Sequence, residues 1–196
     1  VKNNVIEDIV ESIDEFESSD AEFIDVGQRA IIPGFIDAHN HLVWAGDRFN
    51  EHRLRMEGKS YADIAKMGGG IMQTVQSTRH ASDEQLYRIG MNRLKESLQN
   101  GTTFLEAKSG YGLSTKDELR LLEIVDLLKK ASNVPSIHST WMGAHAITPE
   151  HTYASYTEEI LSEQLPKVLD SNLAESVDVF CEPGWFNIEQ SEDILR

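Results

Sequence analysis

The chain has little of several residue types, and each shortage excludes a class of protein. A single cysteine, Cys181, among 196 residues leaves no internal disulfide and fits a reducing compartment. Bases number 18 against 33 acids, and the resulting net charge of −15 disfavours nucleic acid and anionic membranes as partners. No stretch approaches the ~18 apolar residues of a membrane helix, and no apolar signal segment opens the chain. We therefore expect a cytoplasmic globular protein.

Strand-like and helix-like segments alternate from residue 33 onward, and 40% of the residues are hydrophobic, which suffices for one sizeable core. The strands are expected near 33–41, 102–107, 135–142 and 177–181. Alternation of this kind predicts βαβ units, an α/β class and a parallel sheet. Glycine-rich nucleotide-binding turns are missing, which argues against a doubly wound sheet. Four units make half of an eight-fold barrel, whose active site lies where the strands end.

Helix boundaries are marked by capping signals. Ser82 and Gln85 form a capping box, and Gly101 is expected to end that helix. Thr115 to Glu118 reads as a second capping box, for a helix that runs to about residue 131. A third helix is expected to open at Thr157 and to be kinked or split by Pro166. A last helix is expected to be capped within 187–190.

The first 32 residues differ from the rest, since they are acidic and only sparsely apolar. Residues 23–26 predict a short strand, and the acidic stretch 11–22 predicts a solvated surface connection. These pieces are too few to form a core. We interpret 1–32 as flanking β-strands beside a main domain over 33–196.

The stretch around which the rest is organised is Pro33 to His41, an apolar segment that ends in Asp37, His39 and His41. On a strand, side chains two apart point to the same side, about 6–7 Å from each other. Two neutral imidazoles placed in this way can coordinate one metal ion. A bare His-x-His is equally compatible with two ordinary histidines at a strand end.

Residues 42–81 follow without clean periodicity. Arg48 offers a fork of N–H donors that suits a substrate carboxylate, although most arginines form surface ion pairs. Gly68 to Gly70 would let the backbone approach a ligand closely, or they form a plain flexible hinge. One or two helical turns are expected within 61–67.

The motifs together resemble the imidazolonepropionase family of the amidohydrolase superfamily. Pro33 to His41 resembles the first barrel strand of that superfamily. The family's further blocks follow in order at 46–48, 68–71, 74–75, 78–79, 108–113, 142–146 and 177–182. The resemblance implies a distorted (β/α) TIM-type barrel flanked by a small sandwich, of which this chain contains only about the first half.

The resemblance also implies an activity, the hydrolysis of the ring of 4-imidazolone-5-propanoate to N-formimino-L-glutamate in histidine breakdown. It assigns His39 and His41 to one zinc or iron ion. Arg48 corresponds to the arginine that holds the propionate of this small-molecule substrate, and Tyr111 to a substrate-binding tyrosine. His145 corresponds to a histidine that faces the ring, where it or the metal would polarise the carbonyl oxygen.

Some features depart from the family or stay open. Lys108 is not expected to be a metal ligand but to form a hydrogen bond or ion pair, with Glu106 or Glu182. Relatives run to ~400 residues, as a barrel with a flanking domain requires, and the family's third metal histidine, glutamate and aspartate are not present. We therefore expect a fragment that binds metal weakly and has little or no activity, and whose open sheet edges lead either to association, as in a homodimer, or to poor solubility. Rival hypotheses are another cyclic amidohydrolase or deaminase, and a non-catalytic scaffold.

Overall fold

The computed structural model describes residues 1–3, 5–12, 21–60, 63–64 and 67–196. The chain divides into two compact units, Val1–Pro33 and Gly34–Arg196. Within the described ranges, no helix combines the length and apolar composition needed to cross a lipid bilayer. The expected helical turns over 61–67 and the acidic connection over 11–22 fall largely on residues outside this description.

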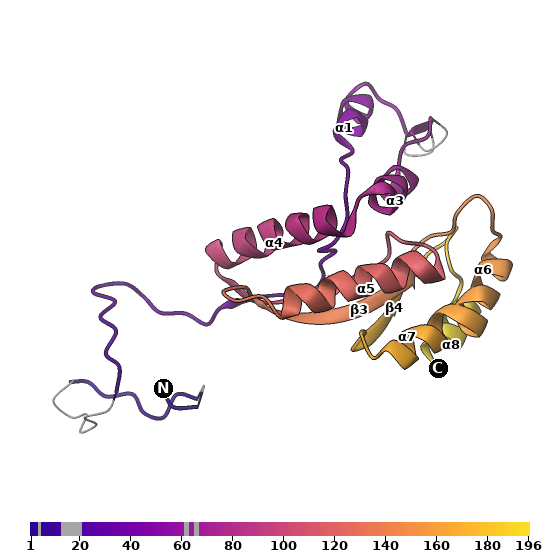
Figure 1. The fold of residues 1–196 in the computed structure, drawn as a ribbon. Coiled ribbons are helices and arrows are strands. Elements are labelled where there is room, and N and C mark those ends of the chain that lie inside the picture. Colours follow the sequence, from indigo (N-terminus) through magenta and orange to yellow (C-terminus); the bar gives the residue numbers. More distant parts are fainter. Residues whose placement is uncertain (4, 13–20, 61–62, 65–66) are drawn as a thin grey trace. The chain divides into compact units, whose positions relative to one another are not determined.

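The second unit contains a four-stranded parallel sheet in the order β1-β2-β3-β4 (Figure 1). Its strands are β1 (Phe35–Asp37), β2 (Thr102–Lys108), β3 (Ser136–Ala144) and β4 (Ser176–Val179). The predicted parallel α/β sheet is thereby confirmed. β1 and β4 are the two edge strands, and each has one paired neighbour.

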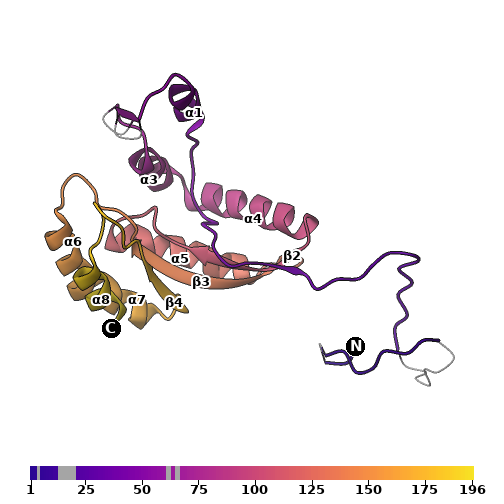
Figure 2. The same ribbon diagram turned by 180° about the vertical axis from the view of Figure 1, so that it is seen from behind.

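Helices follow each strand. They are α1 (Phe49–Met56), α3 (Ile71–His80), α4 (Asp83–Gln99), α5 (Thr115–Lys129), α6 (Tyr153–Glu159), α7 (Leu165–Ser171) and α8 (Ile188–Leu195), with a π-helical turn η2 (Ile160–Gln164) between α6 and α7. Both views show α6, α7 and α8 gathered on the β4 side of the sheet, with α4 and α5 nearer to β2 and β3 (Figures 1 and 2).

Two capping predictions are confirmed and two are wrong. Ser82 and Gln85 cap α4 reciprocally, and Asn187 and Gln190 do the same for α8. α5 is capped by Ser114, whose hydroxyl accepts from the Asp117 amide. Thr115 does not cap the helix, because Glu118, the other half of the predicted capping box, is buried and forms its hydrogen bonds elsewhere. The third helix begins one turn earlier than expected, since Thr152 and Ser155 form its capping box.

The helical segment predicted to kink or split at Pro166 changes type there. The α-helical bonding of α6 gives way to the π-turn η2, and α7 begins at Leu165 with the proline in its first turn. Proline has no N–H to donate, so one hydrogen bond of the α-helical pattern is missing. The wider π-helical turn before it accommodates this loss.

The two faces of the sheet differ in chemistry. One face packs against the helices, with Leu105 of β2, Trp141 of β3 and Leu122 of α5 among its fully buried side chains. The opposite face carries polar residues at alternating positions, such as Glu106 and Thr140, because successive side chains on a strand point to opposite sides. The strands that lead to the carboxyl end of the sheet are thus held on one face by a well-packed layer of helices.

The described part of the first unit has no strand over 23–26, so the strand expected there is wrong. Its one strand-like feature is an isolated bridge between Lys2 and Val5. Phe23 and Ile24 are both more than two thirds exposed, so these side chains lack the partner surface that a half-buried strand needs. The assignment of 1–32 to a flanking sandwich stays a prediction.

Packing of the helical face sets the stability of the second unit. Leu122→Ala removes a fully buried side chain of α5 and should lower the free energy of unfolding by about 2–5 kcal/mol. Leu127→Ala on the same helix is the control, because Leu127 is 52% exposed and its loss should cost about 0.5 kcal/mol or less. Urea unfolding of both variants measures the difference, and equal losses would contradict this packing.

Candidate functional site

The expected geometry of His39 and His41 is wrong in detail, because β1 ends at Asp37 and both histidines lie beyond it. The Asp37 carboxylate closes a bend there: it accepts from the His39 amide at 3.3 Å and from the Asn40 side-chain amide at 2.8 Å. The two rings nevertheless approach each other, with centroids 6.3 Å apart and planes at 80°. A bend held by a carboxylate, not strand alternation, brings them together.

His41 is held in one orientation by the backbone of the neighbouring strand end. Its Nδ1 lies 2.7 Å from the Ser109 carbonyl oxygen. A carbonyl can only accept, so Nδ1 carries the proton and Nε2 has a free lone pair when the ring is neutral. Burial lowers the pKa of His41 to about 3, with a contribution from the His145 imidazole. At neutral pH the ring is therefore uncharged, and its Nε2 can donate a lone pair to a metal ion.

His145 lies just beyond β3 and has the same kind of anchor. Its Nδ1 donates to the Gly110 carbonyl oxygen at 2.9 Å, and its ring stacks on that of His41 at a centroid distance of 4.8 Å. Burial is the main cause that lowers the pKa of His145. Tyr111 completes the cluster, with its ring 4.9 Å from His41 and 5.4 Å from His145.

Arg48 reaches the same cluster from the segment before α1. It lines a cavity of about 430 Å³ together with Tyr111, His145, Arg55, Ile71, Phe180 and Trp185. The structure thus brings three of the sequence-predicted site residues, Arg48, Tyr111 and His145, to one cavity. Phe180 packs edge-on against the His145 ring at 6.0 Å. Arg55 and Trp185 were not singled out from the sequence, which gives no spacing signal for them.

Lys108 is buried at the end of β2 between two carboxylates. Its Nζ lies 2.8 Å from Glu106 and 2.7 Å from Asp178. The ion pair predicted with Glu106 is therefore present, while Asp178 of β4 takes the place proposed for Glu182. The sequence placed Glu182 just after the fourth strand, but Asp178 points to the same face as Glu106 and is the one in reach.

A metal ion fits these histidines in kind, although the donor set is incomplete. Metal–nitrogen bonds of ~2.1 Å place each ring centre roughly 3 Å from a shared ion. The 6.3 Å between the His39 and His41 centroids slightly exceeds the ~6 Å that two such rings can span, so the rings would have to move closer together to share an ion. Within the described ranges, however, no group of three or more His, Cys, Asp or Glu side chains could hold an ion. Catalytic zinc usually has three protein ligands.

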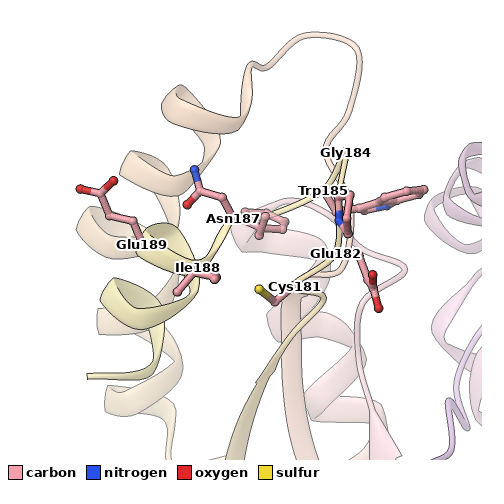
Figure 3. A pocket seen from close by; sticks show the side chains of 9 residues that line it. Cys181, Glu182, Gly184, Trp185, Asn187, Ile188 and Glu189 are labelled. Atoms are coloured by element: carbon pink, nitrogen blue, oxygen red, sulfur yellow. The ribbon is translucent and has the colours of Figure 1, made fainter.

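A larger cavity of about 630 Å³ is built by the single segment 181–189, whose Trp185 also lines the smaller cavity (Figure 3). Cys181, Asn187 and Ile188 line it, and the Trp185 indole points away from Asn187. None of the predicted site residues lines this cavity. The candidate site is therefore the smaller cavity beside the imidazoles.

The fold and the site define an α/β protein that gathers titratable and aromatic side chains at the carboxyl ends of parallel strands, a usual place for a ligand site. No family model matches the chain. It is similar to curated relatives named imidazolonepropionase. Those of Thermoanaerobacter pseudethanolicus, Shewanella putrefaciens and Shewanella sediminis are 49%, 47% and 47% identical.

The alignments cover most of this chain and less than half of each relative. The Thermoanaerobacter match spans 177 residues, which is 89% of this chain and 42% of the relative. The two Shewanella matches span 167 residues, 84% of this chain and 41% of each relative. The chain is thus homologous to imidazolonepropionases over about two fifths of their length, which confirms the resemblance predicted from the sequence.

The position of Lys108 makes a prediction about stability. Lys108→Met leaves two carboxylates facing each other without a cation and should cost on the order of 3 kcal/mol of unfolding free energy. Adding Glu106→Gln should restore part of the loss, because one of the charges then disappears. Lys95→Met on the exposed face of α4 is the control. If chemical denaturation finds Lys108→Met as stable as that control, the buried ion pairs are unimportant.

Proposed function

We propose that the chain is part of an imidazolonepropionase, which hydrolyses the ring of 4-imidazolone-5-propanoate to N-formimino-L-glutamate. In this proposal, the four-stranded sheet is half of an amidohydrolase (β/α) barrel. The observation that supports it most is the convergence of Arg48, Tyr111 and His145 on one cavity beside His41, in a chain 47–49% identical to relatives of that name.

The cavity suits a ring that bears a carboxylate. The Arg48 guanidinium would pair with the anionic propionate and so fix the orientation of the ring. Tyr111 and Phe180 offer aromatic faces against which a planar ring can pack. A volume of about 430 Å³ is within the range of small-molecule sites.

The role proposed for His145 follows from its tautomer. Because Nδ1 donates to Gly110, Nε2 of the neutral ring is an acceptor. An acceptor suits an N–H group of the substrate ring. The expectation that His145 polarises the carbonyl oxygen would need a second proton on the imidazole, and burial opposes that charge.

His39 and His41 would hold the metal, and the free Nε2 of His41 is the matching donor atom. A bound zinc or iron ion supplies Lewis acidity and activates water for hydrolysis. The chain's own contribution is to present neutral, oriented imidazoles and to position the substrate ring beside them. Further ligands are not found among the described residues.

Two rivals remain testable. Another cyclic amidohydrolase or a deaminase would share the two histidines but would not need Arg48 when its substrate is neutral. A non-catalytic scaffold would need neither the arginine nor the oriented rings. The response of ligand binding to the Arg48 charge therefore separates the proposed function from both rivals.

Arg48→Ala should weaken binding of imidazole-4-propionate about tenfold, the loss of roughly one charge-assisted contact at an exposed arginine. Binding of 4-propylimidazole, which replaces the carboxylate by a methyl group, should not change. NMR titration of both ligands against the unmodified chain and the variant measures the four affinities.

The matched control is Arg53→Ala. Arg53 lies on α1, pairs with Glu57 and does not line the cavity. It should leave both affinities unchanged. An equal loss for both ligands in Arg48→Ala, or no loss for either, would refute the propionate role and favour a neutral substrate or a scaffold.

A further inference from the structure

Glu118 is a fully buried carboxylate that the proposed chemistry leaves without a role. It lies in the first turn of α5 and faces the loop 109–113, which connects β2 to that helix. Its Oε1 accepts from the amides of Gly112 and Leu113 at 2.8 and 2.7 Å, and its Oε2 accepts from the Gly110 amide at 2.9 Å. One side chain thus accepts hydrogen bonds from three backbone amides of the loop.

The loop is packed so closely that side chains are excluded from it. A Cβ at Gly110, where φ is +102°, would come within 2.9 Å of the His145 Nδ1 and the Met142 carbonyl oxygen. A Cβ at Gly112 would come within 2.6 Å of the backbone at Asp117 and Glu118. The second face of the loop is held by Arg79, which donates to the carbonyls of Gly112 and Leu113 at 2.7 and 3.0 Å.

The Ser109–Gly110 peptide links Glu118 directly to His41. Its N–H donates to Glu118 Oε2, and its carbonyl oxygen accepts from His41 Nδ1 at 2.7 Å. In a planar trans peptide, the N–H and C=O point in opposite directions. Fixing the N–H on the carboxylate therefore aims the C=O at the imidazole.

We infer that Glu118 is a positioning residue of the candidate site, which sets the orientation and tautomer of His41 through the Ser109–Gly110 peptide. The next carbonyl of the same loop, that of Gly110, receives His145 Nδ1 at 2.9 Å. The carboxylate therefore orders the backbone from which both imidazoles are oriented. The inference rests on the proposed function only in assigning these rings to the site.

Glu118→Gln tests the inference with little change of size. The amide can accept at its oxygen, but its NH₂ group would face a backbone N–H, so at least one of the loop bonds is lost. Nitrogen-15 NMR of the full chain at neutral pH reports which ring nitrogen carries the proton. We expect His41 protonated only at Nδ1 in the unmodified chain and a mixture of both tautomers in Glu118→Gln.

Two controls make the result specific. Glu123→Gln changes an exposed carboxylate of the same helix and should leave both rings unchanged. His80 is an internal reference, because its Nδ1 donates to the Gln76 carbonyl within its own helix, α3. A His41 tautomer that stays pure in a folded Glu118→Gln, in which the Gly110 amide signal has shifted, would overturn the inference.

The unmodified chain decides the question if Glu118→Gln does not fold. Scalar couplings across hydrogen bonds should connect the Gly110 nitrogen with the Glu118 carboxyl carbon, and His41 Nδ1 with the Ser109 carbonyl carbon. Loss of either coupling from the spectrum of the folded chain would overturn the inference. None of these readouts uses a substrate, so the outcome is independent of the Arg48 experiment on the proposed function.

Discussion

The arrangement of the site depends on one buried carboxylate and the backbone that it holds. Glu118 fixes the loop that follows β2, and the carbonyls of that loop fix the protonated nitrogens of His41 and His145. Both rings are anchored on backbone carbonyls and buried, and burial favours their neutral forms, in which Nε2 is an acceptor. A fold that buries an acid at the start of α5 in this way orients two bases at the end of the sheet.

The polar face of the sheet provides the second constraint. Glu106 accepts from both Lys108 and Thr140, and Lys108 also reaches Asp178, so β2, β3 and β4 are connected side by side through their side chains. Glu106 Oε2 is buried without a partner within the described residues. The Lys108 ammonium is therefore tied into the sheet by both carboxylates.

Periodicity and capping chemistry were enough to predict most of the second unit. The parallel sheet, the Ser82 cap and the Asn187 cap follow from local patterns, because neighbouring residues determine them. Local patterns failed where distant partners decide. Glu118 has the spacing of a capping residue, yet its carboxylate binds the preceding loop. β1 stops at Asp37 because this side chain bonds the bend that follows. The strand predicted over 23–26 does not form, because its side chains have no surface to pack against, and a local pattern cannot show whether such a surface exists.

The central claim is that Arg48, Tyr111 and His145 form one site for a small ring with an anionic tail. A crystal structure of the chain with imidazole-4-propionate tests it most directly. The account predicts the carboxylate within hydrogen-bond distance of the Arg48 guanidinium and the ring between Tyr111 and His145 Nε2. A ligand bound in the cavity of residues 181–189, or bound with its carboxylate directed away from Arg48, would contradict the claim.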